Sequence, residues 1–369
     1  MSCSSKPGHG SQRMQGLGAL TLGVCLSALA AAPAVAAEDL SGETVQIVYN
    51  TGPGGAVGLS AQLIAANLGR FLPGEPEVIA VPMPGGALLR GIRYVHASEP
   101  DGLTLGWLAW GGATRVIDPP ELQVPFHEMG ILGGLATQWV THVRTETAGG
   151  TVATPEDFMA LGTIRAGGIA PNVSTDIRTA ASLDILGLEN DYVGGHTGGA
   201  DVLAAMRRGE IDLRSGTVAN YLTTIVPEMV ETGETLPLYY WGQPVEGGEA
   251  ENPALEGIPT FHAFATRQTG SAPSGPAYDL IRYLTRNADG LAWLFATPPG
   301  ASDAVQDMYA EAFAQMMADP DFTAEMAQVL GAEPAVVLRD EAQAIVEEVR
   351  AVSPEIVETM QGYIERYSR

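Results

Sequence analysis

The parts of the sequence that most clearly suggest a binding function are its glycine-rich turns. Each of these turns lies between an expected strand and an expected helix. The first, residues 50–55, follows the apolar run 45–49, and the second, residues 83–86, follows the run 78–81. In such a turn, unpaired backbone N–H groups and the positive end of the next helix dipole face outward from the sheet edge. That geometry holds anions such as carboxylates or phosphates. The alternative interpretation is a pair of tight connections that bind nothing.

Two further glycine turns of this kind occur in the middle of the chain. An expected strand at 163–166 leads into Gly167 to Asn172, and Ser174 and Thr175 stand at the head of the next helix. A second glycine turn, residues 194–199, precedes an expected helix at 200–208. Ser174 and Thr175 are ordinary helix-capping residues in the first place. Their hydroxyls and the neighbouring amides also suit a carboxylate.

Three kinds of side chain are candidates for additional ligand contacts. His196 lies within the turn 194–199 and either contacts ligand or caps backbone groups. Trp110 follows the expected strand 103–108, and it either stacks on a planar ligand or packs against a hinge segment. An acidic chain that binds an anion favours one buried arginine as a charge partner. The candidates for that role are Arg90, Arg115 and Arg178.

Composition excludes several classes of protein. Both cysteines, Cys3 and Cys25, and the single lysine, Lys6, lie near the N-terminus. Setting aside Lys6 and Arg13 from the 19 basic residues leaves 17 arginines against 43 acidic residues, a net charge of about −26. A P-loop and a Schiff base both require lysine, and a thiolate site requires cysteine. So acidic a surface repels nucleic acid and anionic membranes, and we expect neither as a partner.

We expect no metal and no cofactor. The histidines that follow residue 37 and lie outside the glycine turns show no metal-ligand spacing and no partner pattern; they are His96, His127, His142 and His262.

The first residues are typical of an export signal. Arg13 provides a basic start, residues 17–30 form an apolar core, and Ala34-Val35-Ala36 provides a cleavage site of small residues. We therefore expect residues 1–37 to be a signal peptide, cleaved near Ala36 or Ala37, and the mature protein to be periplasmic.

The remaining pattern predicts an α/β fold with two lobes. Strands that alternate with helices imply a parallel sheet, with ligands at the carboxyl ends of its strands. We expect the first lobe at 38–144, the second at 145–250, and a return to the first lobe with C-terminal helices at 251–369, mostly helical from residue 259. The hinge crossings are expected at 143–150 and 242–257. Hinged proteins of this kind close around a small ligand.

The sequence resembles the receptor proteins of tripartite tricarboxylate transporters, known as TctC or Bug-type solute receptors. Several motifs carry the resemblance in order along the chain: M-P-G-G at 83–86, P-D-G-L-T-L-G at 100–106, R-R-G-E-I-D at 207–212, T-P-P-G at 297–300 and A-D-P-D-F at 318–322. The resemblance covers essentially the whole chain after the signal peptide.

The resemblance implies a type II periplasmic binding protein fold without catalytic activity. It implies a small di- or tricarboxylic, amino or aromatic acid, held by backbone amides of both lobes and delivered to the membrane permease subunits of such a transporter; we expect a monomer. The chain departs from the family pattern where an acid, an arginine, a tyrosine and a glycine-serine are usual. Those positions hold Val57-Gly58, Gln62, His196 and Asn172-Val173.

The predicted ligand-binding residues are those of the four turns and the adjoining helix and strand ends. They are Asn50, Thr51, Gly54, Gly55, Ala56, Pro84, Gly85, Gly86, Trp110, Gly168, Ile169, Asn172, Ser174, Thr175, Gly195 and His196.

Two other classes remain as alternatives. One is a sensory receptor that presents its ligand to a membrane kinase. The other is a hydrolase that uses Ser174, Asp176 and His196, although the chain contains neither a G-x-S-x-G elbow nor an H-E-x-x-H motif.

Overall fold

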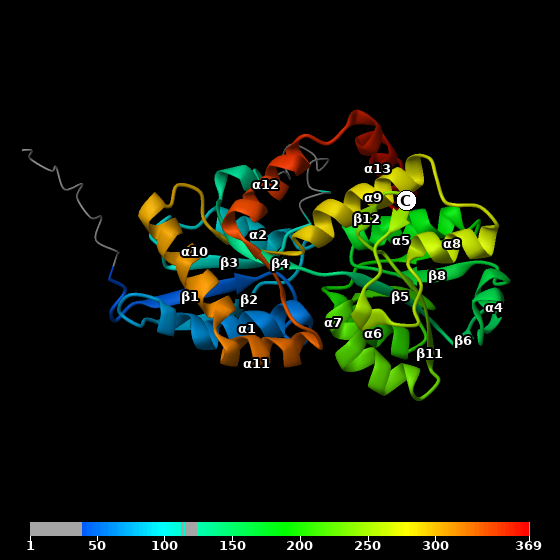
Figure 1. The fold of residues 1–369 in the computed structure, drawn as a ribbon, viewed down its shortest axis with the longest axis horizontal. Coiled ribbons are helices and arrows are strands. Elements are labelled where there is room, and N and C mark those ends of the chain that lie inside the picture. The colour runs from blue at the N-terminus through cyan, green and yellow to red at the C-terminus, as the bar shows by residue number, and fades with distance from the viewer. Residues whose placement is uncertain (1–38, 112–113, 115–123, 369) are drawn as a thin grey trace, which may run out of the picture. The chain divides into compact units, whose positions relative to one another are not determined.

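The computed structural model describes residues 39–111, 114 and 124–368 (Figure 1). The predicted signal peptide and Arg115 therefore lie outside the described residues. Within the described ranges, no helix combines the length and the apolar character needed to cross a membrane.

The first sheet contains β1, the strand that leads into the first glycine turn. Its six strands, in sheet order, are β15 (Ala335–Leu338), β4 (Gly130–Ala136), β14 (Trp293–Thr297), β3 (Thr104–Ala109), β1 (Thr44–Tyr49) and β2 (Glu77–Pro82). Strands β2 and β3 both run parallel to β1, whereas β14 is antiparallel to both β3 and β4. In β1, Val45, Ile47 and Val48 are fully buried because helices cover both faces of the sheet.

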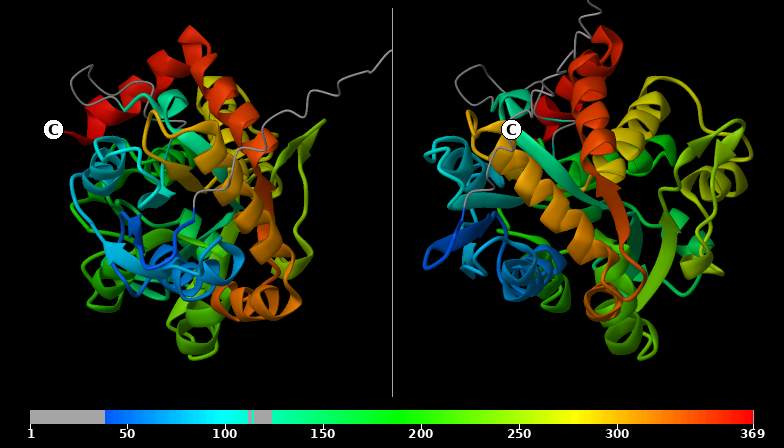
Figure 2. Two further views of the ribbon diagram at one scale, coloured as in Figure 1. Left: turned by 90° about the vertical axis from the view of Figure 1, so that its left-hand side faces the viewer. Right: turned by 60° about the vertical axis from the view of Figure 1, so that its left-hand side comes forward.

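One face of this sheet packs against α1 (Ala56–Leu68), α10 (Asp303–Ala318) and α11 (Pro320–Leu330). Figures 1 and 2 show α1 and α11 side by side. The other face packs against α2 (Leu89–His96) and α12 (Arg339–Arg350). The core of the first face is held by Trp107, whose indole N–H donates to the Ser60 hydroxyl at 2.8 Å. The first glycine turn is therefore anchored between a fixed strand and a fixed helix.

The second sheet has five strands. In sheet order they are β11 (Thr235–Tyr240), β5 (Trp139–Arg144), β10 (Leu213–Thr217), β8 (Ile164–Gly167) and β9 (Asn190–Val193). Strands β8, β9 and β10 are parallel, and β5 is antiparallel to β10 and β11. The helices that accompany this sheet are α4 (Pro155–Met159), α5 (Ser174–Ile185), α6 (Gly199–Arg207), α7 (Val218–Asn220), α8 (Phe261–Thr269), α9 (Pro276–Leu284) and α13 (Pro354–Tyr367). Helix α9 packs on both α5 and α13.

The chain passes between the two sheets at other positions than the predicted ones. The run 131–143, which we expected in the first lobe, is two strands: β4 ends at Ala136 in the first sheet, and β5 begins at Trp139 in the second. The first crossing is therefore at residues 137–138 and not at 143–150. The residues at which we expected this crossing instead contain two short paired strands, β6 (Glu146–Thr147) and β7 (Gly150–Thr151).

The return crossing is also later than predicted. Residues 242–257 contain the hairpin of β12 (Pro244–Val245) and β13 (Gly248–Glu249), and α8 and α9 still pack on β11 and α5. The chain returns through the π-helical turn Thr285–Asp289 and enters β14. The two crossings touch, because the backbone N–H of Thr137 donates to the carbonyl of Asp289 at 3.0 Å.

The sequence pattern predicted no strand at β10, β14 or β15, and the last two interrupt the stretch that we expected to be mostly helical. The segment Tyr221–Val230 is π-helical and contains Pro227.

Candidate ligand-binding site

A cavity of about 550 Å³ lies where the glycine turns of the two sheets meet. Residues 51–57 of the first turn form one side of it, and residues 167–169, 173–176 and 197–204 of the second sheet form the other. The turns approach closely: a Cβ placed on Gly198 would lie 3.6 Å from the Cβ of Thr51. Trp139 and Ala288, next to the two crossings, also line the cavity.

Three helices begin at this cavity without a capping side chain. They are α1, α5 and α6, whose N-cap residues are Gly55, Val173 and Gly198. The first N–H groups of a helix have no partner within it, and the helix dipole adds positive potential there. Helix α1 also has no acidic residue in its first turn. The convergence of these N-termini makes the cavity favourable for an anion.

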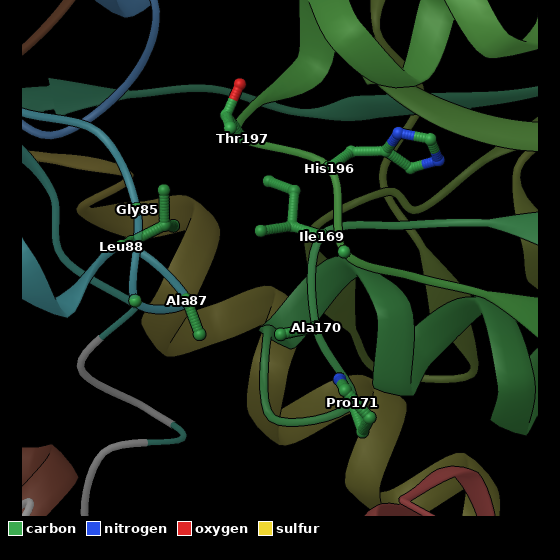
Figure 3. Close-up of a pocket in the computed structure, with 10 residues that line it drawn as sticks. Gly85, Ala87, Leu88, Ile169, Ala170, Pro171, His196 and Thr197 are labelled. Carbon is green, nitrogen blue, oxygen red and sulfur yellow. The ribbon is translucent and has the colours of Figure 1, made fainter.

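A second cavity, of about 390 Å³, lies between the turn Gly85–Leu88 and the second sheet (Figure 3). It shares Leu88, Ile169 and Thr197 with the larger cavity, so the two adjoin. Gly85 and Gly86 have φ angles of +110° and +61°, and Ala87 and Leu88 continue the run at +52° and +71°. Positive φ is unfavourable for residues other than glycine, and such strain concentrates at functional sites.

The buried carboxylate of Asp176 shapes the second-sheet side. It accepts hydrogen bonds from the backbone N–H of Ile169 at 2.7 Å, from that of Ala170 at 3.0 Å and from the Tyr192 hydroxyl at 2.7 Å. Burial raises the pKa of Asp176 to about 6, although these three donors oppose the shift. Only glycine fits at position 168, because a Cβ there would lie 2.3 Å from the Asp176 Oδ2.

The structure brings twelve of the sixteen predicted residues to these two cavities. Those on the larger cavity are Thr51, Gly54, Gly55, Ala56, Gly168, Ile169, Ser174 and Thr175, and those only on the smaller one are Gly85, Gly86, Gly195 and His196. Asn50, Pro84, Trp110 and Asn172 line neither of them.

Asn50 and Trp110 have structural roles instead of the predicted ligand contacts. The buried Asn50 side chain donates to the carbonyls of Leu88 and Ala109 and accepts from the Ala109 N–H, and so it joins the two glycine turns. Trp110 is 1% exposed, and its indole N–H donates to the Leu291 carbonyl. Its ring fills the core instead of facing a ligand.

His196 contributes its backbone to the smaller cavity, while its ring points away from the turn Gly85–Leu88 (Figure 3). Its Nδ1 lies 3.7 Å from the Asp201 carboxylate, and its Nε2 is buried without a hydrogen-bond partner. Among the described residues, no hydrogen bond joins His196 to Ser174 or Asp176, so the geometry does not support the hydrolytic set. The described part of the chain also contains no cluster of metal-ligating side chains.

Two arginines line the larger cavity, Arg207 and Arg214, and neither was among the predicted candidates. Arg178 is paired with Asp289 in the core, and Arg90 is exposed. Arg214, on β10, lines the larger cavity and is 1% exposed. The sequence of residues 213–217 predicts no strand, and so Arg214 could not be placed beside the glycine turns from the sequence.

Two mixed α/β sheets, joined by adjacent crossings and with glycine turns around a shared cavity, define a type II periplasmic binding protein fold. Solved structures of several other proteins are similar to it. BugD, a periplasmic binding protein, has a TM-score of 0.63 at 17% identity over 87% of this chain and 97% of that chain. MatC from Rhodopseudomonas palustris with bound malate has 0.60 at 14% identity over 88% and 97%. Another R. palustris protein, with adipate, has 0.65 at 18% identity over 86% and 97%.

Neither a protein-family model nor a curated protein sequence matches the chain. The predicted likeness to Bug and TctC receptors is therefore confirmed by structure, at the level of the fold.

Proposed function

We propose that this protein is an exported receptor that captures a small carboxylate solute and delivers it to a membrane permease of the tripartite tricarboxylate type. The observation that carries the proposal is the convergence of three helix N-termini without capping side chains on one cavity between the sheets. Such N–H groups bind oxyanions directly. The malate and adipate complexes of two proteins with this fold support a carboxylate as the ligand.

Capture needs no chemical step in this mechanism. The carboxylate accepts hydrogen bonds from backbone N–H groups of the turn at Gly54 and Gly55 on one sheet and of the start of α5 on the other. Because it bridges the sheets, it favours the conformation in which they approach each other, and the flexing segments are the crossings near residues 137–138 and 289–292. A permease then recognises the closed form.

The proposal includes a periplasmic location, after removal of the predicted signal peptide, and a monomer as the capturing unit. A sensory receptor would use the same capture step, and its partner would be a membrane kinase. Pull-down of permease subunits, as opposed to a kinase, by the ligand-bound receptor distinguishes the two.

Native mass spectrometry of the purified protein, followed by a thermal-shift screen, tests the capture step. The screen contains mono-, di- and tricarboxylates, amino acids and aromatic acids, with neutral and cationic solutes as controls. A ligand stabilises the folded state in proportion to the logarithm of its excess over the dissociation constant. A carried-over or stabilising carboxylate is the expected result. Stabilisation by neutral or cationic solutes alone would overturn the carboxylate assignment.

A further inference from the structure

Arg214 carries a buried positive charge without an acidic partner among the described residues. Its guanidinium donates one hydrogen bond, from Nη1 to the Asn220 Oδ1 at 3.0 Å, and its Nε has none. An amide oxygen orients the guanidinium but does not neutralise it. Burial, and to a lesser degree the charge of Arg207, lower the pKa of Arg214 to about 10, so it stays charged at neutral pH.

Among the residues that the structure describes, no carboxylate forms an ion pair with Arg214, although Asp176 of α5 and Asp201 of α6 line the same cavity. Across the sheet, Arg214 pairs in register with His142, a fully buried residue whose pKa is held well below its usual range by burial and then by Arg214 itself. Arg207 forms an ion pair with Glu228. A buried charge is costly when it is unpaired, and an anion from outside is what would satisfy it.

Arg214 lies beside the start of α6, at the wall of the larger cavity. A Cβ on Gly199, the first residue of α6, would lie 3.7 Å from the Nη2 of Arg214. The N-cap of α6 has no side-chain hydrogen bond. The acidic residue of its first turn, Asp201, accepts a hydrogen bond from the backbone N–H of Thr197 at 3.0 Å. A helix N-terminus and an unpaired guanidinium thus face the same space.

We infer that Arg214 and the N-terminus of α6 form a second anion subsite, distinct from the one at the glycine turns of α1 and α5. The inference rests on the proposed function and extends it, since it assigns the ligand two acidic groups. One carboxylate binds the backbone amides of the first subsite, and the other takes the free edge of the Arg214 guanidinium. A planar guanidinium matches a carboxylate in two parallel hydrogen bonds, which makes a second carboxylate the favoured group. The receptor therefore selects dicarboxylates over monocarboxylates.

Isothermal titration calorimetry with matched acids tests this selection. Succinate and butanoate, glutarate and pentanoate, and adipate and hexanoate differ within each pair by one carboxylate in place of a methyl group. For the pair that binds best, we expect the dicarboxylate to bind at least ~10-fold more tightly, as a charge-assisted hydrogen-bonded contact predicts. Arg214→Gln should bring this ratio close to one by weakening the dicarboxylate alone.

A second variant keeps the test independent of any folding defect in Arg214→Gln. Asn220→Asp leaves the arginine in place and provides an internal carboxylate at the same hydrogen-bonding position, which should compete with the ligand and also reduce the ratio at least ~10-fold. The matched controls are Arg165→Gln, whose arginine pairs with Asp212, and Asn190→Asp, whose amide donates to the Tyr367 hydroxyl. Neither residue lines the cavity, and both controls should keep the selectivity of the wild type.

The outcomes separate the inference from the proposed function. Loss of selectivity in both cavity variants, with both controls unchanged, supports the subsite. Unchanged selectivity in both cavity variants overturns it and leaves the receptor function standing, provided that the wild type binds carboxylates. A wild type that binds none of the six acids and no other carboxylate of the thermal-shift screen overturns both.

Discussion

The Arg178 guanidinium and the Asp289 carboxylate form a bidentate ion pair, with nitrogen–oxygen distances of 2.6 and 2.7 Å. Both side chains are fully buried. Arg178 belongs to α5, and Asp289 ends the π-helical turn through which the chain returns to the first sheet. The guanidinium also lies 4.5 Å from the centroid of the Trp241 ring. The ion pair therefore fixes the return crossing to the second sheet as far as Asp289, and bending between the sheets is left to the residues that follow.

Breaking this pair on one side should destabilise the fold severely. Asp289→Asn leaves Arg178 charged and buried without a counterion, and we expect a loss of about 3–5 kcal/mol in the free energy of unfolding. Urea denaturation measures it. The double variant Arg178→Met with Asp289→Leu should recover most of that loss, since it removes both charges together. A loss below about 1 kcal/mol in the single variant would contradict the structural role of the pair.

The first glycine turn can be tested by a substitution that the fold tolerates. A Cβ on Gly55 meets no atom within 4 Å, so Gly55→Val should change stability by less than about 0.5 kcal/mol. Its side chain would nevertheless cover the N-terminus of α1, and the affinity for the bound carboxylate should fall at least ~10-fold. Calorimetry measures binding, and urea denaturation measures stability.

Gly58→Val provides the contrast to Gly55→Val one turn further along α1. A Cβ on Gly58 would lie 2.6 Å from the carbonyl oxygen of Gly52 and 2.8 Å from the Pro53 Cα. This variant should lose about 1–3 kcal/mol of stability through overpacking. Equal affinity of Gly55→Val and the wild type would remove this turn from the site.

Local patterns in the sequence were enough to predict the glycine turns and the first three strands. In the stretch 45–55, an apolar strand followed by glycines has few alternatives, and twelve of the sixteen predicted residues do line the two cavities. Asn50 and Trp110 lie next to the turns, but their side chains are used to hold the turns in place. Position along the chain predicts proximity, whereas the direction of a side chain depends on tertiary packing.

The lobe boundaries required information that no local pattern carries. Strands β4 and β5 form one apolar run in the sequence, and only their hydrogen-bonding partners show that they belong to different sheets. Strand β14 is short and buried on both faces, so it lacks the alternation that identifies a half-buried strand. Arg214 was missed for a related reason, because its strand, L-R-S-G-T, contains little that is apolar.

Ligand affinity should depend on the ionisation of Asp176. Its carboxylate holds the N–H groups of Ile169 and Ala170 best when it is ionised, and its pKa is raised to about 6, chiefly by burial. We expect the dissociation constant to increase several-fold as the pH falls through about 6, and Asp176→Asn to remove this dependence. Calorimetric titrations between about pH 5 and about pH 8 measure it in both proteins.

Loss of stability at low pH does not account for that change in affinity. The folded-state pKa of Asp176 lies above its unfolded value of 3.8, so its contribution to stability is complete below pH 3.8 and is lost as the pH rises through about 6. The ionisation of the ligand itself is common to both proteins and cancels in the ratio of their dissociation constants. An identical pH dependence in Asp176→Asn would show that another group controls binding.

The stability of the β12–β13 hairpin should decrease as the pH rises, because of Glu249. This carboxylate accepts from the N–H groups of Gly242 at 3.3 Å and His262 at 3.2 Å and from the Tyr278 hydroxyl at 3.2 Å. Burial outweighs these donors and raises the pKa of Glu249 to about 7, from an ordinary value of 4.5. The folded state therefore binds this proton more tightly than the unfolded chain does.

The contribution of Glu249 is present in full below pH 4.5 and is lost as the pH rises through about 7. Between about pH 5 and about pH 8, it amounts to roughly 1–3 kcal/mol. Glu249→Gln keeps a neutral side chain at every pH, so the free energy of unfolding should fall less over this range than in the wild type. Urea denaturation at both pH values measures the difference, and because the other carboxyl groups titrate in both proteins, the comparison isolates Glu249. Parallel pH profiles for the two proteins would mean that the carboxylate is hydrated or neutralised in the folded state.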